Sequence, residues 1–152
     1  MMNHNVCLLK EIDLHLAFGP PGLLPTAGEP GVEPIESALR LADRVTRIHG
    51  WPTLIYSLAV PAEDLEKLAA ALGISHREGP RLDPETLEGL ETLLNGLVEW
   101  VRERGLKLLI VDASHADPDE LEVLVPLLRY FSTEWPIYTV LFVPAKENGD
   151  GR

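Results

Sequence analysis

The spacing of apolar residues changes several times along the chain, and each change indicates a new element. Four apolar runs predict β-strands. These runs are Val6 to Phe18, Thr53 to Val60, Lys107 to Asp112 and Ile137 to Val143. Between them, apolar residues recur every three or four positions, which predicts helices that begin at Pro34, Pro61, Pro84 and Pro118.

The order of these elements predicts the fold class. A strand, a helix, a strand, two helices, a strand, a helix and a final strand follow one another. This order is typical of an α/β protein with three layers, in which a mostly parallel sheet of four to five strands carries helices on both faces. Pro126 lies inside the last predicted helix, and we expect it to bend or break that helix because proline removes a backbone hydrogen bond.

The first predicted strand is followed by a segment rich in glycine and proline. Ile12, Leu14 and Leu16 alternate with other residues, which predicts a strand that ends near Phe18. The next segment, Gly19 to Glu33, reads GPPGLLPTAGEPGVE. Its composition predicts a loop without regular structure.

Length and composition fit one globular domain. The chain has 152 residues, of which 45% are hydrophobic, so it can bury a core. We expect residues 1–145 to form one domain and residues 146–152 a disordered tail. The single Cys7 excludes an internal disulfide, fits a reducing compartment and is expected to be a buried thiol. No apolar stretch approaches the roughly 18 residues of a membrane span, and no signal peptide is evident, so we expect a cytoplasmic protein without membrane contact.

The charge balance bears on the class of partner. The chain has 13 Lys and Arg against 24 Asp and Glu, a net charge of -11. That balance disfavours direct binding to a nucleic-acid backbone, because such binding depends on neutralising phosphates. It favours basic protein partners. Since most of the acids lie on predicted helix faces, a solvated surface is the favoured explanation for them.

Candidate ligand-binding residues collect at the predicted carboxyl edge of the sheet, where ligands of open parallel sheets bind. They are Gly19, Gly22, Ser57, Asp112 and Ser114.

The segment DASHADPD, after the third predicted strand, has two interpretations. Asp112 with His115 or Asp117 could bind a metal ion through carboxylate and imidazole ligands, or Asp112 and His115 could act in catalysis, with Asp112 as a general base. Alternatively, Asp112 is an acid that ends a strand and Asp117 is the N-cap of the next helix.

Five aromatic residues are expected around the last helix and the strands, most of them in the core. They are Trp51, Tyr130, Phe131, Trp135 and Tyr138. Tyr130 and Trp135 flank a predicted helix end, so they could be partly exposed and anchor a protein interface.

Three segments carry a resemblance to a known family. LAFGPPG at Leu16 to Gly22 looks like the strand and opening of a Walker A loop. PTLIYSLAVPAEDLEKLAAALGI at Pro52 to Ile74 looks like the next strand, its turn and its helix, and LKLLIVDAS at Leu106 to Ser114 looks like a Walker B strand. Over roughly residues 12 to 144, their order and spacing resemble the core of RecA-like ATPases, especially the KaiC and RadA branch, which implies a RecA-like fold.

The chain departs from that family at the residues that carry its chemistry. A working phosphate loop needs glycine N–H groups around the phosphates, a lysine for the terminal phosphates and a Ser or Thr for magnesium. After GPPG the chain reads LLPTAGEPGVEP, which has no lysine or arginine, and no Gly-Lys-Ser or Gly-Lys-Thr occurs anywhere. Leu58 and Ala59 stand where the resemblance implies a catalytic glutamate after Ser57. The resemblance therefore implies a degenerate Walker A motif and a pseudo-ATPase.

Three functional hypotheses follow. The first is a non-catalytic RecA-like module that regulates or scaffolds another protein, as a homo-oligomer or with a protein partner, and needs no cofactor. The second is a nucleotide- or metal-dependent hydrolase with a repurposed site at Asp112, His115 and Asp117. The third is a loop, Gly19 to Glu33, that binds a small ligand without hydrolysing it. The missing lysine favours the first.

Overall fold

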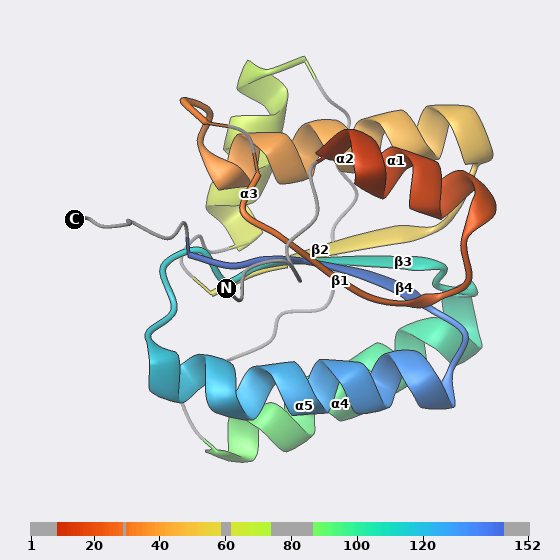
Figure 1. The fold of residues 1–152 in the computed structure, drawn as a ribbon, viewed down its shortest axis with the longest axis vertical. Coiled ribbons are helices and arrows are strands. Elements are labelled where there is room, and N and C mark those ends of the chain that lie inside the picture. Colours follow the sequence, from red (N-terminus) through yellow and green to blue (C-terminus); the bar gives the residue numbers. More distant parts are fainter. Residues whose placement is uncertain (1–8, 29, 59–61, 74–86, 145–152) are drawn as a thin grey trace.

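A parallel four-stranded sheet forms the centre of the structure, a computed structural model that describes residues 9–28, 30–58, 62–73 and 87–144 (Figure 1). Its strands are β1 (Gly22–Thr26), β2 (Thr53–Ser57), β3 (Leu108–Asp112) and β4 (Tyr138–Phe142). They lie in the order β1-β4-β3-β2, and every neighbouring pair is parallel. The predicted α/β class is confirmed.

Helices cover both faces of this sheet. On one face lie α1 (Leu9–Phe18), α2 (Pro34–His49) and α3 (Ala62–Ala71), and on the other lie α4 (Leu87–Arg104) and α5 (Pro118–Glu134) (Figure 1). Strands that are covered on both faces carry apolar residues at nearly every position. Accordingly, all five residues of β3 are buried, which makes β3 the most enclosed strand of the sheet.

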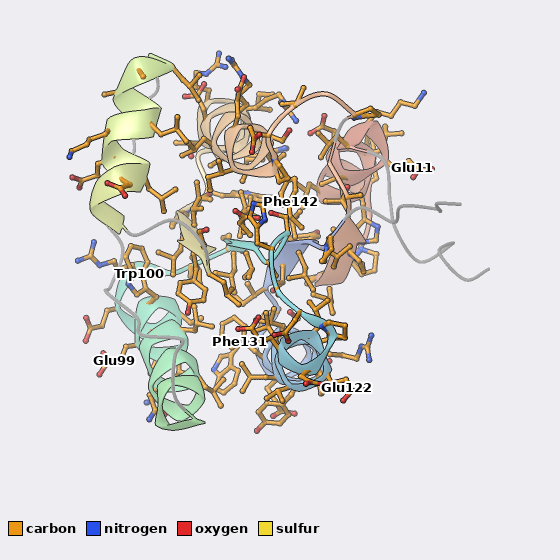
Figure 2. All side chains as sticks on the ribbon, turned by 90° about the vertical axis from the view of Figure 1, so that its left-hand side faces the viewer. Glu11, Glu99, Trp100, Glu122, Phe131 and Phe142 are labelled. Atoms are coloured by element: carbon orange, nitrogen blue, oxygen red, sulfur yellow. The ribbon has the colours of Figure 1, made fainter. Side chains whose placement is uncertain are left out.

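Alternate residues of the strands contribute to two halves of the core. Leu108 and Phe142 belong to the half that includes α1 and α2, whereas Leu109 belongs to the half that includes Phe131 of α5. Figure 2 shows Phe142 and Phe131 on opposite sides of the sheet. Burying one large apolar side chain contributes about 1.5–3 kcal/mol, so each helix layer is held mainly by this alternation.

The described part of the first predicted strand is a helix, so that prediction is wrong. The buried residues of α1 are Ile12 and Leu16, which are four positions apart and therefore share one face of a helix. Leu14, which completed the apparent alternation, is 60% exposed. A spacing of four positions fits both a strand and a helix, and the three alternating residues were too few to separate the two periods.

The first strand lies instead inside the segment that was expected to be a loop. β1 spans GLLPT, and its Leu24 and Thr26 are buried. In the described sheet β1 is an edge strand, with β4 as its neighbour. The carbonyl of Thr26 accepts a hydrogen bond from the N–H of Val143 (2.8 Å). Pro25 therefore faces away from β4, where its missing N–H breaks no bond of the ladder.

The other predicted elements agree with the structure to within a few residues. α2 ends at His49, and its C-cap residue Gly50 has a φ of 68°, the left-handed conformation, and an N–H that donates to the carbonyl of Thr46. α5 continues through Pro126 to Glu134, so the expected break is absent. The predictions for Cys7, Pro61, Pro84 and residues 146–152 lie outside the described residues. Within the described part of the chain, no helix is long and apolar enough to cross a membrane.

The N-terminus of α5 offers a test of local stability. The carboxylate of Asp117 accepts from the N–H of Glu120, and the carboxylate of Glu120 accepts from the N–H of Asp117, both at 2.9 Å. Asp117→Ala should lower the free energy of unfolding by about 1 kcal/mol, because a helix N–H loses its acceptor. Urea denaturation measures this change. Asp117→Asn keeps a side-chain acceptor and should retain most of the stability; an equal loss in both variants would contradict the role of this hydrogen bond.

Candidate functional site

The register of the sheet sets which residues share an edge. Thr26, Phe142, Asp112 and Ser57 are aligned across β1, β4, β3 and β2. Each is the last residue of its strand. This carboxyl edge is the place where open α/β sheets bind their ligands, so it is the candidate site.

Asp112 is the acidic centre of this edge. It is 2% exposed, and its carboxylate accepts three hydrogen bonds. The Ser57 hydroxyl donates to Oδ2 at 3.2 Å, and the N–H and hydroxyl of Ser114 donate to Oδ1 at 3.1 and 2.6 Å. The carboxylate therefore joins the end of β2 to the turn after β3. The structure brings three of the predicted residues together in this way, and the contacts offset the cost of burying the acid.

His115 and Asp117 do not complete a metal site with Asp112. Both are exposed, and Asp117 is the N-cap of α5, as the alternative interpretation expected. Within the described residues, no group of three or more His, Cys, Asp or Glu side chains is placed to hold a metal ion. The geometry that the hydrolase hypothesis requires is therefore absent from this part of the chain.

The turn between β1 and α2 ends at the same edge and has the strand–turn–helix form in which phosphate loops occur. Gly28 and Gly31 have φ values of 81° and 80°, which favour glycine. The N–H of Gly28 donates to the hydroxyl of Thr26 (3.1 Å). A Cβ at Gly28 would lie 3.4 Å from the ring of Phe142, so this glycine also allows the turn to pack closely against β4.

The chemistry of this turn differs from that of a phosphate loop. Residues 27–36 read AGEPGVEPIE, without lysine, arginine, serine or threonine. Glu33 is the N-cap residue of α2 but forms no side-chain capping bond, and Pro34 occupies the first turn without an N–H. Glu36 lies in the same first turn. The positive end of the helix dipole therefore already has carboxylates beside it.

Gly19 and Gly22 lie at the opposite edge, so their predicted position is wrong. Gly22 is aligned with Tyr138, the first residue of β4. The carbonyl of Gly19 accepts from the hydroxyl of Tyr138 at 2.6 Å. The prediction failed because the LAFGPPG motif lies at the end of α1 and precedes β1. The turn before α2 was predicted only as part of the loop Gly19 to Glu33, although the Gly-x-x-Gly spacing of Gly28 and Gly31, shortly before the helix-starting Pro34, is a signal that could have found it.

The predicted aromatic group is divided between the two faces. Trp51 stacks on Tyr138, with ring centroids 5.3 Å apart, on the side of α1 and α2. Trp135 belongs to the other half of the core, where it contacts Phe131 and Tyr130. Tyr130 is 53% exposed and meets Trp135 edge-on. Both residues are therefore partly exposed, as expected: Tyr130 is mostly exposed and Trp135 is half-buried.

Comparisons with known proteins agree with this architecture. No family model and no curated protein sequence matches the chain. Among solved structures, it is similar to a KaiC-like protein from the hyperthermophilic archaeon Pyrococcus horikoshii OT3. The TM-score is 0.63 at 16% identity, over 89% of this chain and 67% of that chain. At that identity the likeness establishes the fold, and the resemblance to the KaiC branch is confirmed at this level: the chain has a KaiC-like, RecA-like α/β fold.

Proposed function

We propose that this chain is a pseudo-ATPase, a non-catalytic RecA-like module that regulates or scaffolds a protein partner. The observation that carries the proposal is the composition of the turn between β1 and α2. In a strand–turn–helix phosphate loop, a lysine and a hydroxyl residue at the start of the helix hold the phosphates and magnesium. Pro34 and Ile35 begin the helix here, and Glu33 precedes them.

The electrostatics of the turn support this proposal. Phosphates bind at helix N-termini because free N–H groups and the helix dipole attract negative charge. In this turn Pro30 and Pro34 have no N–H, and Glu33 and Glu36 are acidic. A triphosphate would meet like charges and fewer donors, and no basic residue of the turn could offset them.

The contacts of Asp112 support the same conclusion. An acid that takes part in metal or nucleotide chemistry must present a carboxylate oxygen that the ligand can reach. Asp112 is 2% exposed, and both of its oxygens accept hydrogen bonds from Ser57 or Ser114. We infer that Asp112 now stabilises the strand ends. No observation favours the hydrolase, because His115 and Asp117 are exposed and belong to no metal-binding group of the described chain.

The outer face of α5 supports the protein-binding part of the proposal. Val123 and Tyr130 are 45% and 53% exposed, and a spacing of seven residues places them on one side of the helix. Pro126, between them, is also exposed. A rigid, amphipathic tyrosine in such a stripe is a typical anchor of protein interfaces.

The charged residues around this stripe indicate the charge of the partner that would fit it. α5 carries Arg129 against four acidic residues, namely Asp119, Glu120, Glu122 and Glu134. Figure 2 shows Glu122 directed away from the sheet. An apolar stripe between carboxylates is complementary to an amphipathic segment whose apolar side chains are flanked by lysine or arginine. The proposed partner is therefore basic.

The first prediction concerns nucleotide. Isothermal titration of the wild-type chain with magnesium-ATP should show no binding up to concentrations on the order of 1 mM, because the turn lacks a lysine and carries carboxylates. Asp112→Ala should lower the free energy of unfolding by about 1–3 kcal/mol, because the hydroxyls of Ser57 and Ser114 lose a buried acceptor. Tight ATP binding that disappears in Asp112→Ala would overturn the proposal. Glu122→Ala, an exposed acid on α5, is the matched control for stability.

The second prediction concerns the partner surface. A designed amphipathic helix of leucine and lysine should bind the chain, more weakly as salt increases. Tyr130→Ala should weaken this binding at least about 10-fold, as expected for an interface anchor. Phe18→Ala, which removes an exposed aromatic ring from the other face, should have no effect. Fluorescence anisotropy of the labelled peptide measures both. Equal binding of a peptide in which glutamate replaces lysine would contradict the charge argument.

A further inference from the structure

The outward face of α1 exposes large apolar side chains. Phe18 is 86% exposed and Leu14 is 60% exposed. They are four positions apart and so are neighbours on the helix surface. Ala17, between them on the same face, is also exposed. Single exposed apolar residues are common, but an adjacent leucine and phenylalanine at such exposure form a continuous apolar surface.

α2 extends this surface. Arg44 of α2 donates to both oxygens of Asp13 of α1, at 2.9 and 3.1 Å, which fixes the two helices against each other. α1 is followed by β1 and α2 by β2, and both strands begin at the same edge of the sheet. The two helices therefore run in the same direction (Figure 1). Ala17 lies one turn after Asp13, and Ile48 lies one turn after Arg44. Ile48 is 69% exposed. Leu14, Ala17, Phe18 and Ile48 together are called the α1–α2 patch.

Contacts behind the patch hold it in one position. The side chain of His15 forms a hydrogen bond with the carbonyl of Pro20 (2.8 Å). The hydroxyl of Tyr138 donates to the carbonyl of Gly19, and Trp51 stacks on the Tyr138 ring. The end of α1 is thus fastened to the start of β4. A surface that is already ordered loses less conformational entropy when it binds.

The charge of this region differs from that of the rest of the chain. α1 and α2 together carry equal numbers of basic and acidic residues, namely Lys10, Arg40, Arg44 and Arg47 against Glu11, Asp13, Glu36 and Asp43. Arg40, Arg44 and Arg47 each form an ion pair with one of these acids. The whole chain, in contrast, has a net charge of -11.

This difference indicates which occupant the patch fits. Two copies of an acidic chain repel each other most at their acidic faces, such as α5, and least where charge is balanced. A strongly charged partner would gain little electrostatic attraction from a region whose charges are balanced. A second copy can bring its own balanced, apolar region to the same contact without net repulsion.

We propose that the α1–α2 patch binds the same patch of a second copy about a two-fold axis. In such an interface each copy uses the same residues. When the two α1 helices cross antiparallel at the level of residue 16, Phe18 of each copy packs on Leu14 of the other. Lys10 then lies near the C-terminal end of the other α1, where the helix dipole favours a cation. This contact is independent of the proposed partner surface on α5.

Sedimentation equilibrium and light scattering of the full chain test the proposal. At concentrations on the order of 100 μM, the mass should be that of two chains. Phe18→Glu should raise the dimer dissociation constant at least about 100-fold, because each dimer loses two apolar contacts and brings two carboxylates together. Val123→Glu is the matched control, since it places the same charge on the exposed face of α5, and it should leave the dissociation constant unchanged.

Several outcomes would overturn the proposal: a single-chain mass at every concentration, an assembly larger than two chains, or equal weakening by Val123→Glu. Circular dichroism verifies that each variant is folded, and Leu14→Lys is a second variant at the same contact with the same expected result. Phe18→Glu should retain binding of the leucine and lysine peptide. If Phe18→Glu abolishes the dimer but still binds the peptide, the dimer contact is separate from the proposed partner surface on α5. If the wild-type chain forms the dimer but does not bind the peptide, only the proposed function is contradicted.

Discussion

The in-register parallel pairing of four strands is the constraint on which the other features of this protein depend. Because the pairing has no offset, the last residues of all four strands form one row and the first residues form another. The row of last residues places Ser57 beside Asp112 and directs the turn after Thr26 to the same edge. The opposite edge receives the C-terminal ends of α1 and α2, and this is why Phe18 and Ile48 reach the surface at the same end of the molecule.

Most of the fold could be predicted from periodicity, and the failure at the N-terminus has a specific cause. α2, α4 and α5 each repeat apolar residues over several turns, so their helical period is unambiguous. α1 offers only Ile12, Leu14 and Leu16, and their spacing suits either period. β1 is short, contains Pro25 and is surrounded by glycine and proline, so its local signals were those of a loop. Both errors displaced the expected phosphate loop by one element.

The candidate site could be predicted only in part. Asp112 was identified because an acid at the end of an apolar strand is a local signal, and the N-cap at Asp117 is another. The hydrogen bond from Ser57 to Asp112 joins residues 55 positions apart, and it exists because β2 and β3 are neighbours. Strand order is a property of the whole fold. The same holds for the Phe142 ring behind Gly28: the spacing of Gly28 and Gly31 is a local signal, but the packing of the turn against β4 follows from the fold.

Pro25 also limits how this protein can assemble. An outer strand with a complete row of N–H donors can pair with a strand of another chain. That strand then becomes the new outer strand and can pair again, so such pairing leads to open-ended polymers. The outward side of β1 lacks one donor at Pro25, so the backbone ladder on that side would be interrupted. A two-fold contact between helices, such as the one proposed at the α1–α2 patch, closes after two copies. By weakening the route to open-ended polymers, Pro25 favours association of finite size.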